Sequence, residues 1–206
     1  MKRLDTMTML LVLMTTSGCL KRSEPVVLHT LRPLVAEAQE PAPGLPLAIE
    51  VMPVQLPDLL QRPQIVSVQS PERLTLSEVH HWGNPLEKEI QRVLVENLGS
   101  LLGTETIVAY PLGEQVKATF RLTLEIQNLA GQGGGNLQFQ ALWMLTRQSD
   151  GATVLFRKVK LKEPVPGSDT DALVAAHSRI LAALSREIAG ELKKQTAPQA
   201  SSSSHP

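Results

Sequence analysis

The sequence feature that most constrains the fold is an alternation of apolar and polar residues in two consecutive segments. The apolar positions are Phe120, Leu122, Leu124 and Ile126 in the first segment, and Leu137, Phe139, Ala141 and Trp143 in the second. Successive side chains of a strand point to opposite faces, so both segments are predicted to be strands with one face on a core. The glycine-rich run Gly131–Gly135 separates them, and Asp150 with Gly151 marks the next turn. We therefore expect consecutive antiparallel strands.

Two other segments have the period of an amphipathic helix. In the first, apolar residues recur at three- and four-residue steps from Leu86 to Leu101. Asn84 is expected to cap this helix, Pro85 to occupy its first position, and Gly99 or Gly103 to end it. The second helix is predicted from about Asp171 to Leu192, with Ser168 or Asp169 as its cap. Acidic residues of both helices are assigned to solvated polar faces: Glu87, Glu89, Glu187 and Glu191.

The remaining strands complete the predicted fold. They are Val26–Leu31, Ala48–Gln55, Gln64–Gln69, Arg73–Trp82, Thr106–Tyr110, Lys117–Leu129, Asn136–Arg147 and Thr153–Lys162. The fold class is therefore α+β, an antiparallel sheet packed against two amphipathic helices in a two-layer sandwich. One domain over residues 45–194 accounts for the core.

The N-terminus has the order of a secretory signal. Lys2 and Arg3 form a positive region, Met7–Met14 is apolar, and small residues precede Cys19, which is the one cysteine of the chain. This arrangement resembles the bacterial lipobox, in which cleavage precedes an acylated cysteine, although Thr16 replaces the usual leucine. We expect residues 1–18 to be a lipoprotein signal peptide and Cys19 to carry the lipid. The alternative is a plain secreted protein with a buried thiol.

Two segments flank the predicted domain. Residues 19–44 would hold the acylated N-terminus, a docked strand and a proline-rich connection. Residues 195–206 have no apolar periodicity and are expected to be a disordered tail.

Composition and motifs argue against several function classes. The 20 basic and 20 acidic residues balance, so a nucleic-acid partner is not expected. The sequence has no serine elbow and no free cysteine that could pair with a histidine, so an enzyme is not indicated. No cofactor is predicted. The glycine run precedes a strand rather than a helix, which favours a hairpin loop over a phosphate site.

The histidines do not predict a metal site. His80 and His81 are adjacent on a strand, so their side chains should point to opposite faces and not share an ion. His177 lies on the apolar face of the second helix and is predicted to be a hydrogen-bonded core residue.

Two motifs carry more information than these residues. One is the stretch Leu56–Val66, which contains Pro57, Arg62, Pro63 and Gln64. The other is His81–Leu86, in which Trp82 ends a strand and Pro85 opens a helix. Their residues are candidates either for docking a partner or for a purely structural role.

At these motifs and in the C-terminal helix, the chain resembles the ABC-type transport auxiliary lipoprotein family, which includes the lipoprotein of the paraquat-inducible lipid-transport system. It departs from the family pattern at His81, at Asn84 and at Val26–Leu28, where an arginine, an acidic residue and a tyrosine-rich start are usual. The resemblance implies a non-catalytic lipoprotein on the periplasmic face of the outer membrane. Its partners would be a mammalian-cell-entry (MCE) protein with an inner-membrane permease and ATPase, and it could form a homo-oligomer.

Leu20 follows Cys19 where an aspartate would retain the protein at the inner membrane, and this favours outer-membrane sorting. The alternative function is an outer-membrane lipoprotein that regulates a cell-wall synthase. Such regulators need a long linker, whereas the segment between Cys19 and the first predicted strand is short. An enzyme ranks third.

Overall fold

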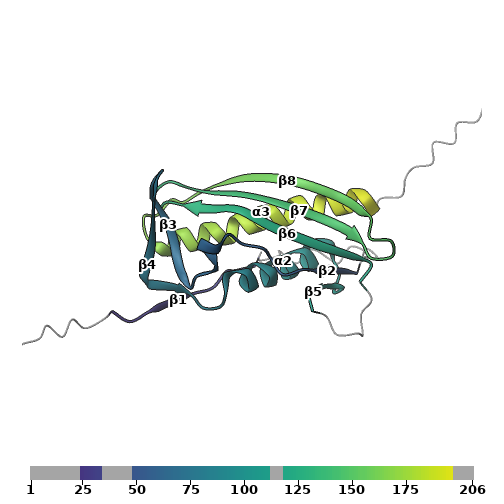
Figure 1. The fold of residues 1–206 in the computed structure, drawn as a ribbon, viewed down its shortest axis with the longest axis horizontal. Helices are drawn as coiled ribbons and strands as arrows, with labels where there is room; N and C mark the ends of the chain where they lie inside the picture. Colours follow the sequence, from purple (N-terminus) through teal and green to yellow (C-terminus); the bar gives the residue numbers. More distant parts are fainter. Residues whose placement is uncertain (1–23, 34–47, 112–117, 197–206) are drawn as a thin grey trace, which may run out of the picture.

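The computed structural model describes residues 24–33, 48–111 and 118–196, which form two sheets and two long helices (Figure 1). The five-stranded sheet has the order β5 (Ile107–Ala109), β2 (Ile49–Val51), β6 (Phe120–Gly131), β7 (Asn136–Arg147) and β8 (Thr153–Pro164). The three-stranded sheet has the order β1 (Val27–His29), β4 (Arg73–Trp82) and β3 (Gln64–Ser70). The helices are η1 (Asp58–Gln61), α2 (Leu86–Leu102) and α3 (Thr170–Thr196).

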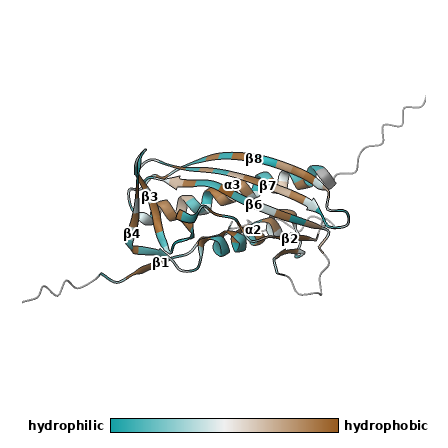
Figure 2. Cartoon of the chain, viewed as in Figure 1, coloured by the Kyte–Doolittle hydropathy of each residue, from teal (hydrophilic) through white to brown (hydrophobic). Residues whose placement is uncertain are grey.

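The predicted α+β sandwich is confirmed. Strands β6, β7 and β8 form the expected antiparallel meander, and their apolar and polar residues alternate along each strand (Figure 2). One face of this meander packs against the helices. Its buried side chains include Leu122, Leu124, Phe139 and Trp143.

The sheet topology adds features that periodicity did not predict. Strand β2 pairs in parallel with both β5 and β6, and β1 pairs in parallel with β4. The connection from β2 to β5 contains α2, as a parallel crossover requires. The strands are also divided between two sheets, with β1, β3 and β4 at one end of the molecule (Figure 1).

The helix ends agree with the sequence only in part. Gly103 ends α2 in a left-handed conformation with φ of 63°, and the Asp169 carboxylate accepts a hydrogen bond from the backbone N–H of Ala172 at the start of α3. The predicted Asn84 cap is wrong, because Pro85 takes the cap position and the Asn84 amide donates to the Glu89 carboxylate instead. Within the described ranges, no helix has both the length and the apolar character needed to cross a membrane.

Candidate functional site

The segment Thr30–Pro33, which follows strand β1, lies across the helices at one end of the domain. We call residues 27–33 the strap. Its first part extends the three-stranded sheet beside β4, and the His29 carbonyl accepts a hydrogen bond from the Gly83 N–H at 2.7 Å. Leu31 is then buried in the core with 1% of its surface exposed. The strap is therefore packed into the domain, and does not merely lie on its surface.

Glu89 of α2 holds the strap in place. Its carboxylate accepts hydrogen bonds from the Thr30 hydroxyl at 2.6 Å and from the Leu31 N–H at 3.1 Å. Arg92 donates both to this carboxylate, at 2.9 Å, and to the Leu31 carbonyl, at 2.7 Å. Burial opposes ionisation of Glu89, but the hydrogen bonds from Thr30, Arg92, Asn84 and Leu31 outweigh it and lower the pKa to about 2.

The prediction of a solvated Glu89 is therefore wrong, since the residue is only 3% exposed. The spacing of Glu89 from the apolar residues of α2 indicates that its side chain is buried. Glu89 lies three residues after Leu86 and four before Val93, which places it on the buried face of α2. A carboxylate on such a face requires donors from elsewhere in the chain, and here the strap and Arg92 supply them.

His29 connects the strap to β4 and α3. Its Nε2 lies 2.9 Å from Nδ1 of His80, and its Nδ1 lies 3.4 Å from the Asp171 carboxylate. Burial lowers the pKa of His29; the Asp171 carboxylate opposes this decrease, and His80 adds to it. The ring is thus held near a carboxylate and still favours its neutral form.

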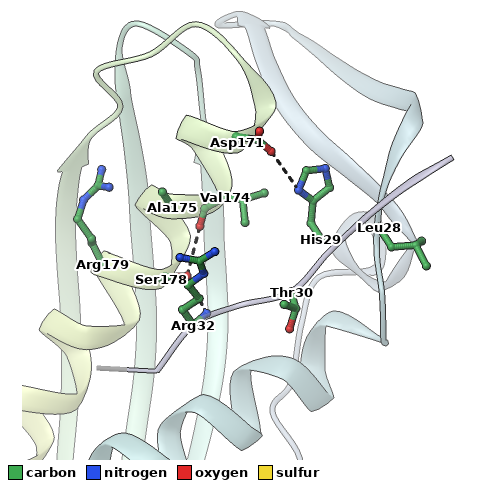
Figure 3. A pocket seen from close by; sticks show the side chains of 9 residues that line it. All are labelled: Leu28, His29, Thr30, Arg32, Asp171, Val174, Ala175, Ser178 and Arg179. Carbon is green, nitrogen blue, oxygen red and sulfur yellow. Dashed lines mark hydrogen bonds and ion pairs between the residues drawn. The ribbon is translucent and has the colours of Figure 1, made fainter. Parts of the chain in front are cut away.

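A pocket of about 580 Å³ opens between the strap and the first turns of α3 (Figure 3). Arg32 and Ser178 both line it, and the backbone N–H of Arg32 donates to the Ser178 hydroxyl at 3.0 Å, while Val174 and Ala175 supply apolar surface. Figure 3 shows His29 directed toward Asp171 at the upper rim, and Arg179 on the far side of α3. The lining mixes charged and apolar groups without a nucleophile and base in contact.

The structure brings the two sequence motifs together beside this strap. The backbone N–H of Trp82 donates to the Pro63 carbonyl at 2.7 Å, and Gln64 pairs with His81 across β3 and β4. Trp82 is 5% exposed and contacts the ring of His177 edge-on, with 5.4 Å between the ring centroids. Trp82 therefore joins the three-stranded sheet to α3, which is a structural role.

The other motif residues lie around this junction. Pro57 starts η1, where its carbonyl accepts a hydrogen bond from the Leu60 N–H, and Pro85 occupies the N-cap position of α2. Arg62 ends η1 and is exposed, and it makes no hydrogen bond or ion pair with another residue of the described ranges. Cys19 lies outside the described residues.

His177 is the predicted core histidine. Its Nδ1 lies 2.8 Å from the Leu173 carbonyl, so the ring donates this bond, and burial lowers its pKa to about 4. Among residues 24–33, 48–111 and 118–196, no three histidine, cysteine, aspartate or glutamate side chains gather as a metal site would require. The glycine-rich run connects β6 and β7, as predicted.

Comparison with known proteins identifies the family. The model of the ABC-type transport auxiliary lipoprotein component matches residues 29–189, so the match begins within the strap and extends through most of α3. No curated protein sequence matches this chain significantly.

Two crystal structures resemble the fold over most of its length. An uncharacterized protein has 24% identity and a TM-score of 0.66, covering 82% of this chain and 99% of its own. A protein from Xanthomonas campestris has 19% identity and a TM-score of 0.62, covering 83% of this chain and 99% of its own. At these identities the likeness concerns the fold alone, and the assignment follows from the family match. The chain belongs to the family of ABC-type transport auxiliary lipoprotein components.

Proposed function

We propose that this protein is a non-catalytic docking component of an MCE-based intermembrane lipid transport system, anchored to the outer membrane through an acylated Cys19. The observation that carries the proposal is the family match over residues 29–189. The lipobox-like sequence is consistent with it, and so is the lining of the strap pocket, in which no nucleophile is in contact with a base. In this scheme, the domain holds the MCE protein at the membrane, while the permease and ATPase act at the inner membrane.

The strap gives the proposed anchor a mechanical role. Glu24, the first described residue, lies five positions after Cys19, and five fully extended residue steps span at most about 18 Å. An acylated Cys19 would therefore hold the end that carries β1, β3 and β4 close to the bilayer. The C-terminal end of α3 lies at the opposite end (Figure 1) and would face the periplasm.

More than one acyl chain is needed for this anchor to be stable. A single chain binds membranes only marginally, whereas two or more chains anchor a protein stably. Since the strap is bonded to both helices, a pull on the anchor would be transmitted to the helices rather than to a loose linker.

The first test is affinity purification of the full-length protein from cross-linked membranes. We expect recovery of an MCE protein, incorporation of labelled palmitate, and loss of both in Cys19→Ala. Recovery of a cell-wall synthase in place of an MCE protein would support the alternative function and overturn the proposal. Unlabelled protein in the membrane fraction would overturn the lipid anchor alone.

Arg62 is the motif residue that we propose contacts the partner, because its guanidinium is exposed and the other motif residues serve turns or packing. Arg62→Glu should reduce recovery of the MCE protein at least fivefold without changing the amount of lipoprotein. Arg186→Glu, at an exposed position of α3, is the matched control and should recover the partner normally. Equal recovery with both variants would exclude Arg62 from the contact.

A further inference from the structure

Among the edge strands of the two described sheets, β8 has the longest and most regular free edge. Strands β1 and β5 have three residues each, and β3 has seven with register shifts at two points. Strand β8 has 12 residues and keeps one register with β7 from Asn136 opposite Pro164 to Leu145 opposite Leu155. Within the described ranges, no strand pairs with its other edge. Such an edge presents a row of backbone N–H and C=O groups that a further strand can bind.

The even-numbered residues of β8 direct their backbone groups to this edge. In an antiparallel pair, the residues that bond to the neighbouring strand alternate with residues that point away from it. The carbonyls of Leu122 and Leu124 in β6 bond to β2, so the odd-numbered residues of β6 bond to β7. The registers of β6 with β7 and of β7 with β8 carry this alternation to the odd-numbered residues of β8. In agreement, the carbonyls of Phe156 and Pro164 accept hydrogen bonds from arginine side chains.

Three lysine side chains follow the same edge. Arg157 and Glu163 of β8 form ion pairs with α3, so the odd-numbered side chains point toward the helices. Lys158, Lys160 and Lys162 therefore point to the opposite face of the sheet. All three are exposed, and their ammonium groups form no ion pair with a described residue. The side chains beside them on β7 are uncharged: Leu142, Gln140 and Gln138.

This charge pattern distinguishes between partners. Glu125 of β6 lies two strands away from Lys158, about 10 Å, and so does not serve as its cross-strand partner. Like charges directly opposite each other destabilise a pair of strands, whereas opposite charges stabilise it. The edge of a second copy, paired antiparallel about Lys160, would place lysine against lysine. A strand with carboxylates at alternate positions would instead place an acidic side chain opposite each lysine.

The other face of the edge is apolar between two charged pairs. Val159 is 4% exposed, and Leu161 is partly buried against the core. The ion pairs of Arg157 and Glu163 with α3 lie on either side of these two residues. A strand added at this edge would therefore have acidic side chains on one face and apolar side chains on the other.

We propose that the free edge of β8 binds an extended segment of a partner protein as an added antiparallel strand, in which acidic and apolar residues alternate. Backbone hydrogen bonds would supply the attachment, and the three lysines would select the sequence, as in other cases of strand addition. The inference does not rest on the proposed transport role, and it concerns a different element from Arg62.

The first test measures binding of a labelled peptide to the full-length protein in a non-ionic detergent by fluorescence anisotropy. The peptide has nine residues, alternating glutamate and valine, and spans about 30 Å when extended. Lys160→Glu should weaken binding about tenfold, because an attractive cross-strand pair becomes a repulsive one. Lys88→Glu, at an exposed position of α2, is the matched control and should leave binding unchanged. No binding to the parent chain, or equal effects of the two substitutions, would overturn the proposal.

A charge exchange keeps the test independent of lost folding. The variant that combines Lys158→Glu, Lys160→Glu and Lys162→Glu should lose the glutamate peptide and gain binding of a peptide that alternates lysine and valine. This gain requires a folded β8. A variant that binds neither peptide, or still binds the glutamate peptide, would contradict the proposed charge pairing.

Backbone methylation separates strand addition from simple attraction of charge. In the antiparallel arrangement the glutamates of the peptide lie opposite the lysines, so their N–H groups point toward β8. N-methylation of the glutamates should abolish binding, and N-methylation of the valines should preserve it. Undiminished binding of the N-methylglutamate peptide would overturn strand addition.

Hydrogen exchange identifies the occupant of the edge. The glutamate peptide should slow exchange of the amides of Lys158, Lys160 and Lys162 and leave β5 unchanged. Slowed exchange that develops without peptide as the protein concentration rises would assign the edge to a second copy. Slowed exchange on addition of phosphatidylglycerol vesicles would assign it to a lipid surface. Either result would overturn the proposal.

Discussion

The two sheets of this domain are stabilised in different ways. The meander β6–β8 has three long strands that are neighbours in sequence, and its inner face is formed by fully buried apolar side chains. The three-stranded sheet combines the hairpin β3–β4 with β1, which ends 35 residues before β3 begins. Polar contacts around Glu89 hold that distant strand and the strap after it.

The meander and the strap should therefore respond differently to pH and to substitution. Apolar burial is insensitive to pH and makes the meander a rigid support. A charged hydrogen-bond network depends on protonation and on each of its partners. The segment nearest to the proposed anchor is therefore the part whose attachment can be removed by a single substitution, as the following predictions test.

The largest effect is expected from the core of the meander. Leu124 of β6 is 1% exposed, and Leu124→Ala should lower the free energy of unfolding by about 3 kcal/mol through lost burial and a cavity. Urea unfolding measures this loss. Thr123→Ala, on the opposite face of β6, should change stability by less than about 0.5 kcal/mol. Similar losses in the two variants would mean that the two faces do not differ as described.

The strap should respond to a substitution at Glu89. Glu89→Ala leaves the Thr30 hydroxyl and the Leu31 N–H without their acceptor and removes one of the acceptors of the Arg92 guanidinium, so it should destabilise the strap by about 2 kcal/mol. Hydrogen exchange should become faster at Leu31 and remain slow in β7. Glu87→Ala, on the same helix, is the control and should leave Leu31 protected. Faster exchange throughout β7 would contradict the separation of the two regions.

Acid should release the strap through the same carboxylate. The pKa of Glu89 is about 2 in the folded domain and 4.5 in its ordinary state, so the folded form binds fewer protons between these values. Its contribution is complete above about pH 4.5 and decreases as the pH falls toward 2. Protection of Leu31, measured against pH, should decline over this window. Glu89→Gln, which cannot titrate, should remove the decline, and its persistence would assign the effect to another group.

The smallest effect is expected at a turn of the meander. Gly151, between β7 and β8, has φ of 70°, and a Cβ atom there would meet no other atom within 4 Å. Gly151→Ala should therefore cost about 1 kcal/mol through backbone conformation alone. Gly190→Ala, which also has open space but lies within α3, should instead stabilise by about 0.5–1 kcal/mol. Thermal or urea unfolding of both variants distinguishes an effect of backbone conformation from an effect of steric crowding around the added Cβ atom.

Elements that depend on local periodicity could be predicted from the sequence. The alternation around Leu124 and Trp143 identified β6 and β7, and the glycines identified the turn between them, because neighbouring antiparallel strands need only a short connection. The apolar spacing of both helices and the C-terminal position of Gly103 were likewise visible.

The candidate site was less accessible to such reasoning. The sequence indicates that the motifs around Pro63 and Trp82 are informative. It does not predict that they contact each other or the strap. Glu89 was assigned to solvent, because its partners Thr30 and Leu31 are 58 or more residues away and helical periodicity does not report distant hydrogen bonds. The parallel pairing of β1 with β4 was missed for the same reason.

The two amphipathic helices, the meander and the fold class can be predicted from the amino-acid sequence, since they follow from side-chain periods of 3.6 and 2 residues. Three features appear only in the folded domain: the strap is fixed to both helices, a buried carboxylate holds it, and Glu125, Leu142 and Lys158 lie side by side across β6, β7 and β8. Each of these depends on the register between segments that are separate in the chain. That register is selected by packing and hydrogen bonding across the whole domain, which a local pattern does not encode.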